Sequence, residues 1–108
     1  MFMTLIQLRR RIDIIDRQIL GLLSTRQQVV VRIAGLKKLQ HRKIYQPDRE
    51  VQVLADKTRL AQKHNLSPKF VGQIFRLILA ESKRIQRSLI KSSVSLSGLS
   101  VSAASAKF

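Results

Sequence analysis

Two cations interrupt the apolar pattern of the first forty residues. Arg26 occupies a seam position that a heptad repeat reserves for an aliphatic side chain. Lys37 follows eleven residues later, which on a helix is about 20° from alignment and roughly 16 Å further along the axis. An arginine is costly to bury without a negative partner. The pattern therefore predicts either an anion-binding site or an ion pair between Arg26 and Asp13 or Asp16 of a partner helix.

A second apolar stripe, near the end of the chain, is also interrupted by polar residues. Ser82 lies on the stripe that contains Ile78 and Ile85, and Gln86 follows one turn later on the same side. We therefore expect a hydroxyl and an amide to face inward together. The alternative is that Ser82 bonds back to its own helix while Gln86 lies at an exposed edge.

Asp48, Arg49 and Glu50 form a third polar cluster, where a helix is expected to begin. The two carboxylates suit the helix dipole, whereas a cation in a first turn is mildly unfavourable and needs another explanation. Cations, a hydroxyl, an amide and a carboxylate together bind polyanions and stabilise developing charge. Without a cysteine or a hydroxyl nucleophile beside a histidine, they do not predict covalent catalysis.

Composition narrows the class of protein. The 108 residues allow one small domain, and a hydrophobic content of 44% is enough for a folded core. With no cysteine and two histidines, neither a disulfide nor a metal site is expected, and no cofactor is predicted. The net charge of +15 favours anionic partners. The apolar start precedes three arginines at residues 9–11, the reverse of a secretory signal, so we expect a cytoplasmic protein without a membrane segment.

The elements that position these residues are predicted to be helices. Thr4 is a suitable N-cap, no proline precedes Pro47, and one helix from Thr4 to about Leu39 would be roughly 50 Å long. Such a helix overhangs a globule of about 100 residues, whose radius of gyration is near 13 Å. Its apolar seam therefore predicts a homodimer. The seam residues, spaced by three and four, are Leu5, Leu8, Ile12, Ile15, Ile19, Leu22, Val29, Ile33 and Leu36.

Two shorter helices are predicted after a polar loop at residues 40–46. Pro47 opens the second helix, which ends in a left-handed turn at His64 and Asn65. Its predicted apolar side consists of Val51, Leu54, Leu60 and Ala61. Ser67 and Pro68 start the third helix, whose stripe is Val71, Ile74, Ile78, Ile85 and Leu89. The predicted fold class is all-α, with long, short and medium helices in residues 1–91 and a disordered serine-rich tail in residues 92–108.

The sequence resembles the all-helical chorismate mutases from residue 5 to about residue 91. The resemblance is carried by LRRRIDIIDRQILGLLSTR in the first helix, LKK and IYQPDRE leading to the second, and AESKRIQ in the third. It implies a three-helix protomer whose long first helices pair in an intertwined homodimer with two equivalent active sites. The implied reaction is the rearrangement of chorismate to prephenate, on the route to phenylalanine and tyrosine.

The resemblance also implies which residues hold the substrate carboxylates. Arg26, Arg49 and Lys37 would surround them, helped by Ser82. Arg9 would enter the site from the other protomer. Helix geometry agrees with this, because Arg9 and Arg26 are seventeen residues apart, about 25 Å along one helix, which is too far to hold one small molecule within one chain.

The remaining implied roles concern the ether oxygen and the ring hydroxyl. Lys37 and Gln86 would donate hydrogen bonds to the ether oxygen, and Glu50 would accept one from the hydroxyl. Gln46 stands where some relatives carry aspartate, and its carbonyl would accept the same bond. A unimolecular pericyclic reaction needs the substrate held in its compact diaxial form with donors at the oxygen that gains charge, but no external acid, base or nucleophile.

Two other functions remain as alternatives. Isochorismate pyruvate lyases resemble this chain but tend to have an apolar residue at the position of Glu50, so this glutamate favours the mutase. A basic helical nucleic-acid-binding dimer would suit the charge, but aromatic residues make up only 5% and the cations lie within apolar seams. The surplus cations are interpreted as solvated helix faces that steer a dianion: Lys38, Arg42, Lys43, Lys83, Arg84 and Arg87.

Overall fold

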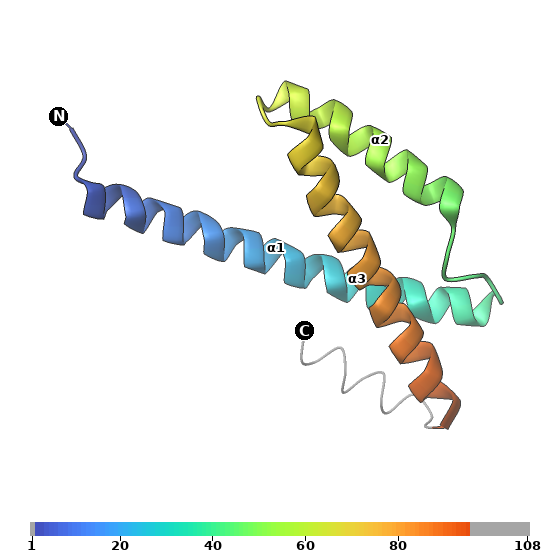
Figure 1. The fold of residues 1–108 in the computed structure, drawn as a ribbon. Coiled ribbons are helices and arrows are strands. Elements are labelled where there is room, and N and C mark those ends of the chain that lie inside the picture. The colour runs from blue at the N-terminus through green and yellow to red at the C-terminus, as the bar shows by residue number, and fades with distance from the viewer. Residues whose placement is uncertain (1, 96–108) are drawn as a thin grey trace.

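The computed structural model describes residues 2–95, which form three helices joined by short loops (Figure 1). Helix α1 spans Leu5–Leu39, α2 spans Pro47–Lys63 and α3 spans Pro68–Ser95. The all-α class and the order of long, short and medium helices are thus confirmed. Helix α3 continues past residue 91, where the serine-rich composition predicted a disordered tail to begin. The rest of that predicted tail, residues 96–108, lies outside the described residues.

Local signals set the helix ends at the predicted places. Thr4 forms a capping box, in which its hydroxyl accepts from the Gln7 backbone N–H at 3.2 Å and its own N–H donates to Gln7 Oε1 at 2.9 Å. The Ser67 hydroxyl accepts from the Phe70 N–H at 3.2 Å and caps α3. Asn65, with φ of 57°, provides the left-handed end predicted for α2.

The end of α1 has the same geometry, although no glycine marks it in the sequence. His41 adopts φ of 56°, its N–H donates to the Lys38 carbonyl at 3.2 Å, and the Arg42 N–H donates to the Lys37 carbonyl at 2.8 Å. These paired bonds are a Schellman motif, which turns the chain sharply. The following loop returns toward α1, where the Ile44 carbonyl accepts from Lys37 Nζ at 3.0 Å.

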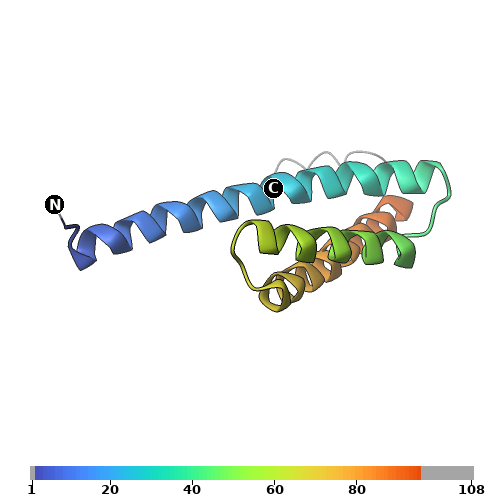
Figure 2. The same ribbon diagram turned by 90° about the horizontal axis from the view of Figure 1, so that it is seen from above.

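Helix α3 packs against both other helices. Figures 1 and 2 show it crossing the C-terminal part of α1 and running beside α2. Between α1 and α3, Val30 and Val31 pack against Ile85 in a small core, with Leu89 partly buried at its edge. The helix pair α2–α3 thus sits on one end of α1, which is where the polar interruptions of the sequence also lie.

The buried face of α2 differs from the prediction at one position. Val51 is 67% exposed, whereas Val53 is buried and Ala61 is buried as expected. Residues 51 and 53 lie about 200° apart around a helix, so they cannot share a face. The face that α2 turns toward the rest of the protomer therefore contains Val53 and Ala61 but not Val51. Helix α2 packs mainly against α3.

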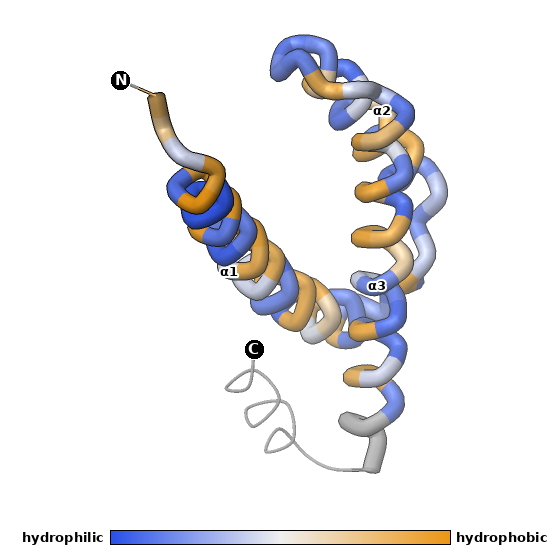
Figure 3. The backbone as a smooth tube through the Cα atoms, turned by 60° about the vertical axis from the view of Figure 1, so that its left-hand side comes forward, coloured by the Kyte–Doolittle hydropathy of each residue, from blue (hydrophilic) through white to orange (hydrophobic). Residues whose placement is uncertain are grey.

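Within the described residues 2–95, neither α2 nor α3 lies beside the N-terminal half of α1 (Figure 2). Hydrophobic residues recur along the length of α1 (Figure 3). In its N-terminal half, Leu5, Ile12 and Leu22 are 61%, 56% and 71% exposed. The radius of gyration, 17.6 Å, exceeds the value of about 13 Å for a globule of this length. The predicted overhang of the long helix is therefore present. No helix within residues 2–95 is long and apolar enough to cross a membrane.

We expect Ile85→Ala to lower the free energy of unfolding by about 2 to 5 kcal/mol, because it removes a 4% exposed side chain from the α1–α3 core. Urea unfolding at one fixed protein concentration measures the change. Gln62→Ala on the exposed side of α2 is the control and should change stability by less than about 0.5 kcal/mol. Equal stability of the two variants would contradict the assignment of this core.

Candidate active site

A cavity of about 260 Å³ lies where α1, α2, α3 and the α1–α2 loop meet. This volume is near the lower end of the range for small-molecule sites. Its apolar walls are Val30, Ile33, Ile44, Val53 and Leu79. The structure brings most of the predicted site residues to this one cavity, namely Arg26, Lys37, Gln46, Arg49, Glu50, Ser82 and Gln86.

Arg26 is held by a hydrogen bond from α1 to α3. Its Nη1 donates to Ser82 Oγ at 2.5 Å, and the Ser82 hydroxyl donates in turn to the Ile78 carbonyl at 2.9 Å. Ser82 is 8% exposed, so it faces inward and also bonds back to its own helix. Because its single proton is used by Ile78, Ser82 positions the Arg26 guanidinium rather than offering a donor of its own.

Lys37 is held in the same way, about three turns further along α1. Its Nζ donates to Gln86 Oε1 at 2.9 Å and to the Ile44 carbonyl at 3.0 Å. Gln86 is 6% exposed, so it lies inside rather than at an edge. An ammonium has three donors, and the bond to Oε1 orients the Gln86 amide. One Lys37 N–H and the Gln86 NH₂ group therefore remain as donors for a ligand.

The electrostatic environment of the cavity favours an anion. Burial lowers the pKa of the Arg26 guanidinium, and the nearby charge of Arg49 lowers it further. Burial also lowers the pKa of Lys37, an effect that the Glu50 carboxylate opposes. Among the described residues that line the cavity, four are cations, with Lys83 the fourth, and one is a carboxylate. A bound dianion would compensate this excess of positive charge.

Gln46 and Glu50 bring acceptors from the start of α2. Gln46 precedes the first residue of the helix, and its Nε2 donates to the Lys43 carbonyl at 3.3 Å, which leaves Oε1 as the atom that can accept from a ligand. Glu50 lies in the first turn of α2, where a carboxylate also suits the helix dipole.

Lys83 belongs to the cavity, and its interpretation as part of a solvated helix face was wrong. It lines the cavity with its side chain 22% exposed, and its Nζ lies 3.0 Å from Glu50 Oε2. The sequence contains a weak signal for this, because Lys83 precedes Gln86 by three residues and so lies near it on the helix surface. The Ile44 carbonyl is a further polar group of the cavity that was not predicted, because a backbone group leaves no such signal in the sequence.

Arg9 does not line this cavity in the protomer. It lies on the exposed N-terminal half of α1, and its distance from Arg26 along the helix, about 25 Å, places it beyond the reach of the same site. Within one protomer the cavity therefore presents Arg26, Arg49, a Lys37 donor and the Gln86 amide donor to a ligand. It can bind a small dicarboxylate and stabilise charge on a further oxygen, without proton transfer.

Comparison with known proteins agrees with the geometry of this cavity. A bifunctional chorismate mutase/prephenate dehydratase of Escherichia coli (strain K12) is 31% identical over 87 residues, which are 81% of this chain and 22% of the relative. The corresponding protein of Buchnera aphidicola subsp. Acyrthosiphon pisum is 34% identical over 88 residues, covering 82% and 23%. This chain thus spans less than a quarter of the length of these bifunctional relatives.

Another relative is similar in size. The 4-amino-4-deoxychorismate mutase of Streptomyces pristinaespiralis is 33% identical over 85 residues, which are 79% of this chain and 66% of the relative. The sequence profile of one family, described as chorismate mutase type II, matches residues 8–87. That match includes every residue of the cavity and both polar pairs between α1 and α3. The chain belongs to the chorismate mutase type II family.

Proposed function

We propose that this chain rearranges chorismate to prephenate, as a homodimer and without a cofactor or a covalent intermediate. The observation that carries the proposal is the pair of donors, Lys37 Nζ and the Gln86 amide, fixed against each other at 2.9 Å beside Arg26 and Arg49. The two arginines bind the substrate carboxylates and hold the compact diaxial form. Lys37 and Gln86 donate to the ether oxygen, which becomes more negative as its bond to carbon lengthens.

The fixed donors account for catalysis without an acid or a base. The reaction is unimolecular, so the enzyme lowers the barrier by conformational restriction and by charge stabilisation. Because Arg26 and Lys37 are already bonded to Ser82 and Gln86 in the unliganded site, little reorganisation is needed when the substrate binds. Glu50 and Gln46 accept from the ring hydroxyl in this proposal.

The homodimer completes both the core and the site. The seam residues of α1 are mostly half or more exposed in the protomer, a large apolar surface for a soluble chain. A second copy that packs antiparallel along the seam covers this surface. The same packing brings the partner's N-terminal half of α1, with its Arg9, toward the cavity that Arg26 lines, so that a third arginine reaches the substrate.

The ring substituent distinguishes two candidate substrates. One relative is named for 4-amino-4-deoxychorismate, in which an amine replaces the ring hydroxyl of chorismate. We propose the hydroxyl compound for this chain, because the described lining residues include four cations and one carboxylate, a charge balance that disfavours a cationic amine. Isochorismate, the substrate of the pyruvate lyases, belongs in the same assay, and cleavage of isochorismate in preference to chorismate turnover would overturn the proposal.

Lys37→Ala should reduce chorismate turnover by about 100-fold or more, the usual loss when one donor to a developing oxyanion is removed. The loss of chorismate absorbance measures the rate for the wild type and the variant. Lys57→Ala, which removes a lysine outside the cavity, should leave the rate unchanged. Equal rates for wild type and Lys37→Ala would contradict the proposed site.

Mixing two inactive variants tests whether Arg9 acts across the dimer. We expect Arg9→Ala and Lys37→Ala each to be nearly inactive as pure proteins. When both are co-expressed with different tags, random pairing produces mixed dimers with one fully wild-type site, so about a quarter of the wild-type activity should return. Failure of the mixture to regain activity would show that Arg9 does not serve the partner's site.

Activity should be constant between about pH 6 and pH 8, because the Gln86 amide donates without titrating and lysines remain charged in this range. Burial lowers the pKa of Lys37, so its charge is lost at lower pH than that of an exposed lysine, and kcat/KM should fall on the alkaline side. A pH profile of kcat/KM checks both limbs. A steep change between pH 6 and pH 8 would instead indicate a titrating catalytic group.

A further inference from the structure

We propose that Lys83 is a specificity-determining residue, which makes the cavity select a neutral hydroxyl over a cationic amine on the ring of the substrate. The inference rests on the proposed function, because it takes Glu50 to be the group that meets the ring substituent. Nothing in the chemistry of the rearrangement itself requires a lysine at this position, so its presence needs a separate explanation.

Lys83 engages both oxygens of the Glu50 carboxylate. Its Nζ is 3.0 Å from Oε2 and 3.3 Å from Oε1, and both side chains are largely withdrawn from solvent, at 22% and 23% exposure. A partly buried ion pair of this geometry is stronger than a pair at the surface. The charge of the only carboxylate among the described lining residues is therefore already compensated before a substrate binds.

Tyr45 also contacts Lys83. The Lys83 ammonium lies 4.8 Å from the centroid of the Tyr45 ring, within the range of a cation–π contact. Tyr45 comes from the α1–α2 loop, Glu50 from α2 and Lys83 from α3. Three separate segments thus fix one ammonium at the cavity wall, which gives it a defined position rather than a solvated one.

This arrangement affects a hydroxyl and an ammonium in opposite ways. A carboxylate has about four lone-pair sites, so Glu50 can accept from a ring hydroxyl while it stays paired with Lys83. A ring ammonium at the same place would meet a carboxylate whose charge is already neutralised, and it would lie near the positive charges of Lys83 and Lys37. Like charges that are brought close together repel strongly in a partly buried site. Lys83 therefore penalises the amine without preventing binding of the hydroxyl.

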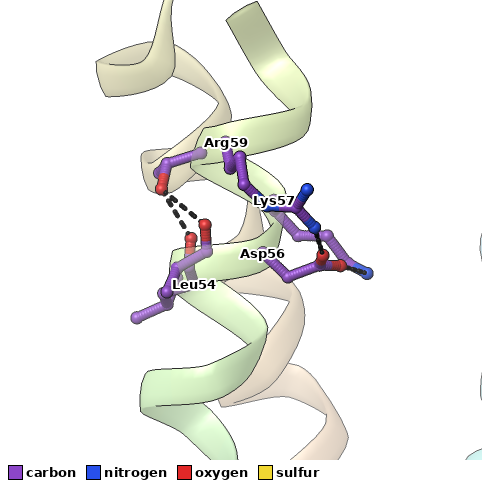
Figure 4. A network of polar contacts seen from close by, with 6 residues as sticks. Leu54, Asp56, Lys57 and Arg59 are labelled. Carbon is purple, nitrogen blue, oxygen red and sulfur yellow. Dashed lines mark hydrogen bonds and ion pairs between the residues drawn. The ribbon is translucent and has the colours of Figure 1, made fainter. Parts of the chain in front are cut away.

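The chain offers a matched control in a second lysine–carboxylate pair. Lys57 Nζ lies 2.9 Å from Asp56 Oδ2 and 5.8 Å from the centroid of the Phe75 ring. Figure 4 shows Lys57 and Arg59 both reaching the Asp56 carboxylate on α2. This pair resembles Lys83 and Glu50 in its contacts, but it does not line the cavity.

The experiment measures kcat/KM for chorismate and for 4-amino-4-deoxychorismate near pH 7.5, where an aliphatic amine is mostly protonated. The proteins are the wild type, Lys83→Met, Lys83→Gln, Lys83→Arg and the control Lys57→Met. We expect the wild type to prefer chorismate, so that kcat/KM for chorismate divided by kcat/KM for 4-amino-4-deoxychorismate exceeds one. Lys83→Met should lower this ratio by about tenfold or more. Lys83→Gln should do the same, whereas Lys83→Arg and Lys57→Met should retain the wild-type ratio.

The outcomes separate this inference from the proposed function. If the wild type turns over chorismate and the ratio is unchanged in Lys83→Met and Lys83→Gln, the role of Lys83 is overturned but the proposed function is not. A loss of preference in Lys83→Arg would also overturn this role, because the charge is kept in that variant. An equal shift in Lys57→Met would do the same, because that lysine lies outside the cavity. No turnover of either substrate by the wild type would overturn the proposed function and this inference with it.

Discussion

The hydrogen bonds that join Arg26 to Ser82 and Lys37 to Gln86 are the constraint on which the rest of the structure depends. They connect α1 to α3 at a contact that would otherwise be apolar, since Val30 lies between the two cations along α1. Polar groups at a buried contact are tolerated only when they are paired. In each of these pairs one side chain is the hydrogen-bond partner of the other, so the site is preorganised before a ligand binds. The polar pairs take the place of apolar packing between α1 and α3.

The chemistry that such a site supports follows from what it contains. Fixed cations and neutral donors stabilise charge that develops on an oxygen, and they do so best in a partly enclosed cavity. The ion pair of Lys83 with Glu50 limits the negative charge that the cavity wall presents. The same excess of cations that would attract a dicarboxylate would repel a positively charged ring substituent, so affinity and selectivity would share one electrostatic origin in the proposed function.

The fold of the protomer was largely predictable, because its signals are local. The caps at Thr4 and Ser67 and the left-handed turn at Asn65 each depend on a few neighbouring residues. The overhang of α1 followed from its length alone. The continuation of α3 into the serine-rich segment was missed, because composition is a weaker indicator of a helix end than a cap or a proline.

By itself the sequence determined the three helices and identified Arg26, Lys37, Ser82 and Gln86 as polar interruptions of apolar stripes, because helical periodicity places each residue on a face. Only the tertiary structure decided which faces meet. It selected Val53 over Val51 as the buried residue of α2, brought the Ile44 carbonyl to Lys37, and paired Lys83 with Glu50. Those outcomes depend on the rotation of α2 about its axis and on the path of a loop, which are set by contacts between segments distant in the sequence.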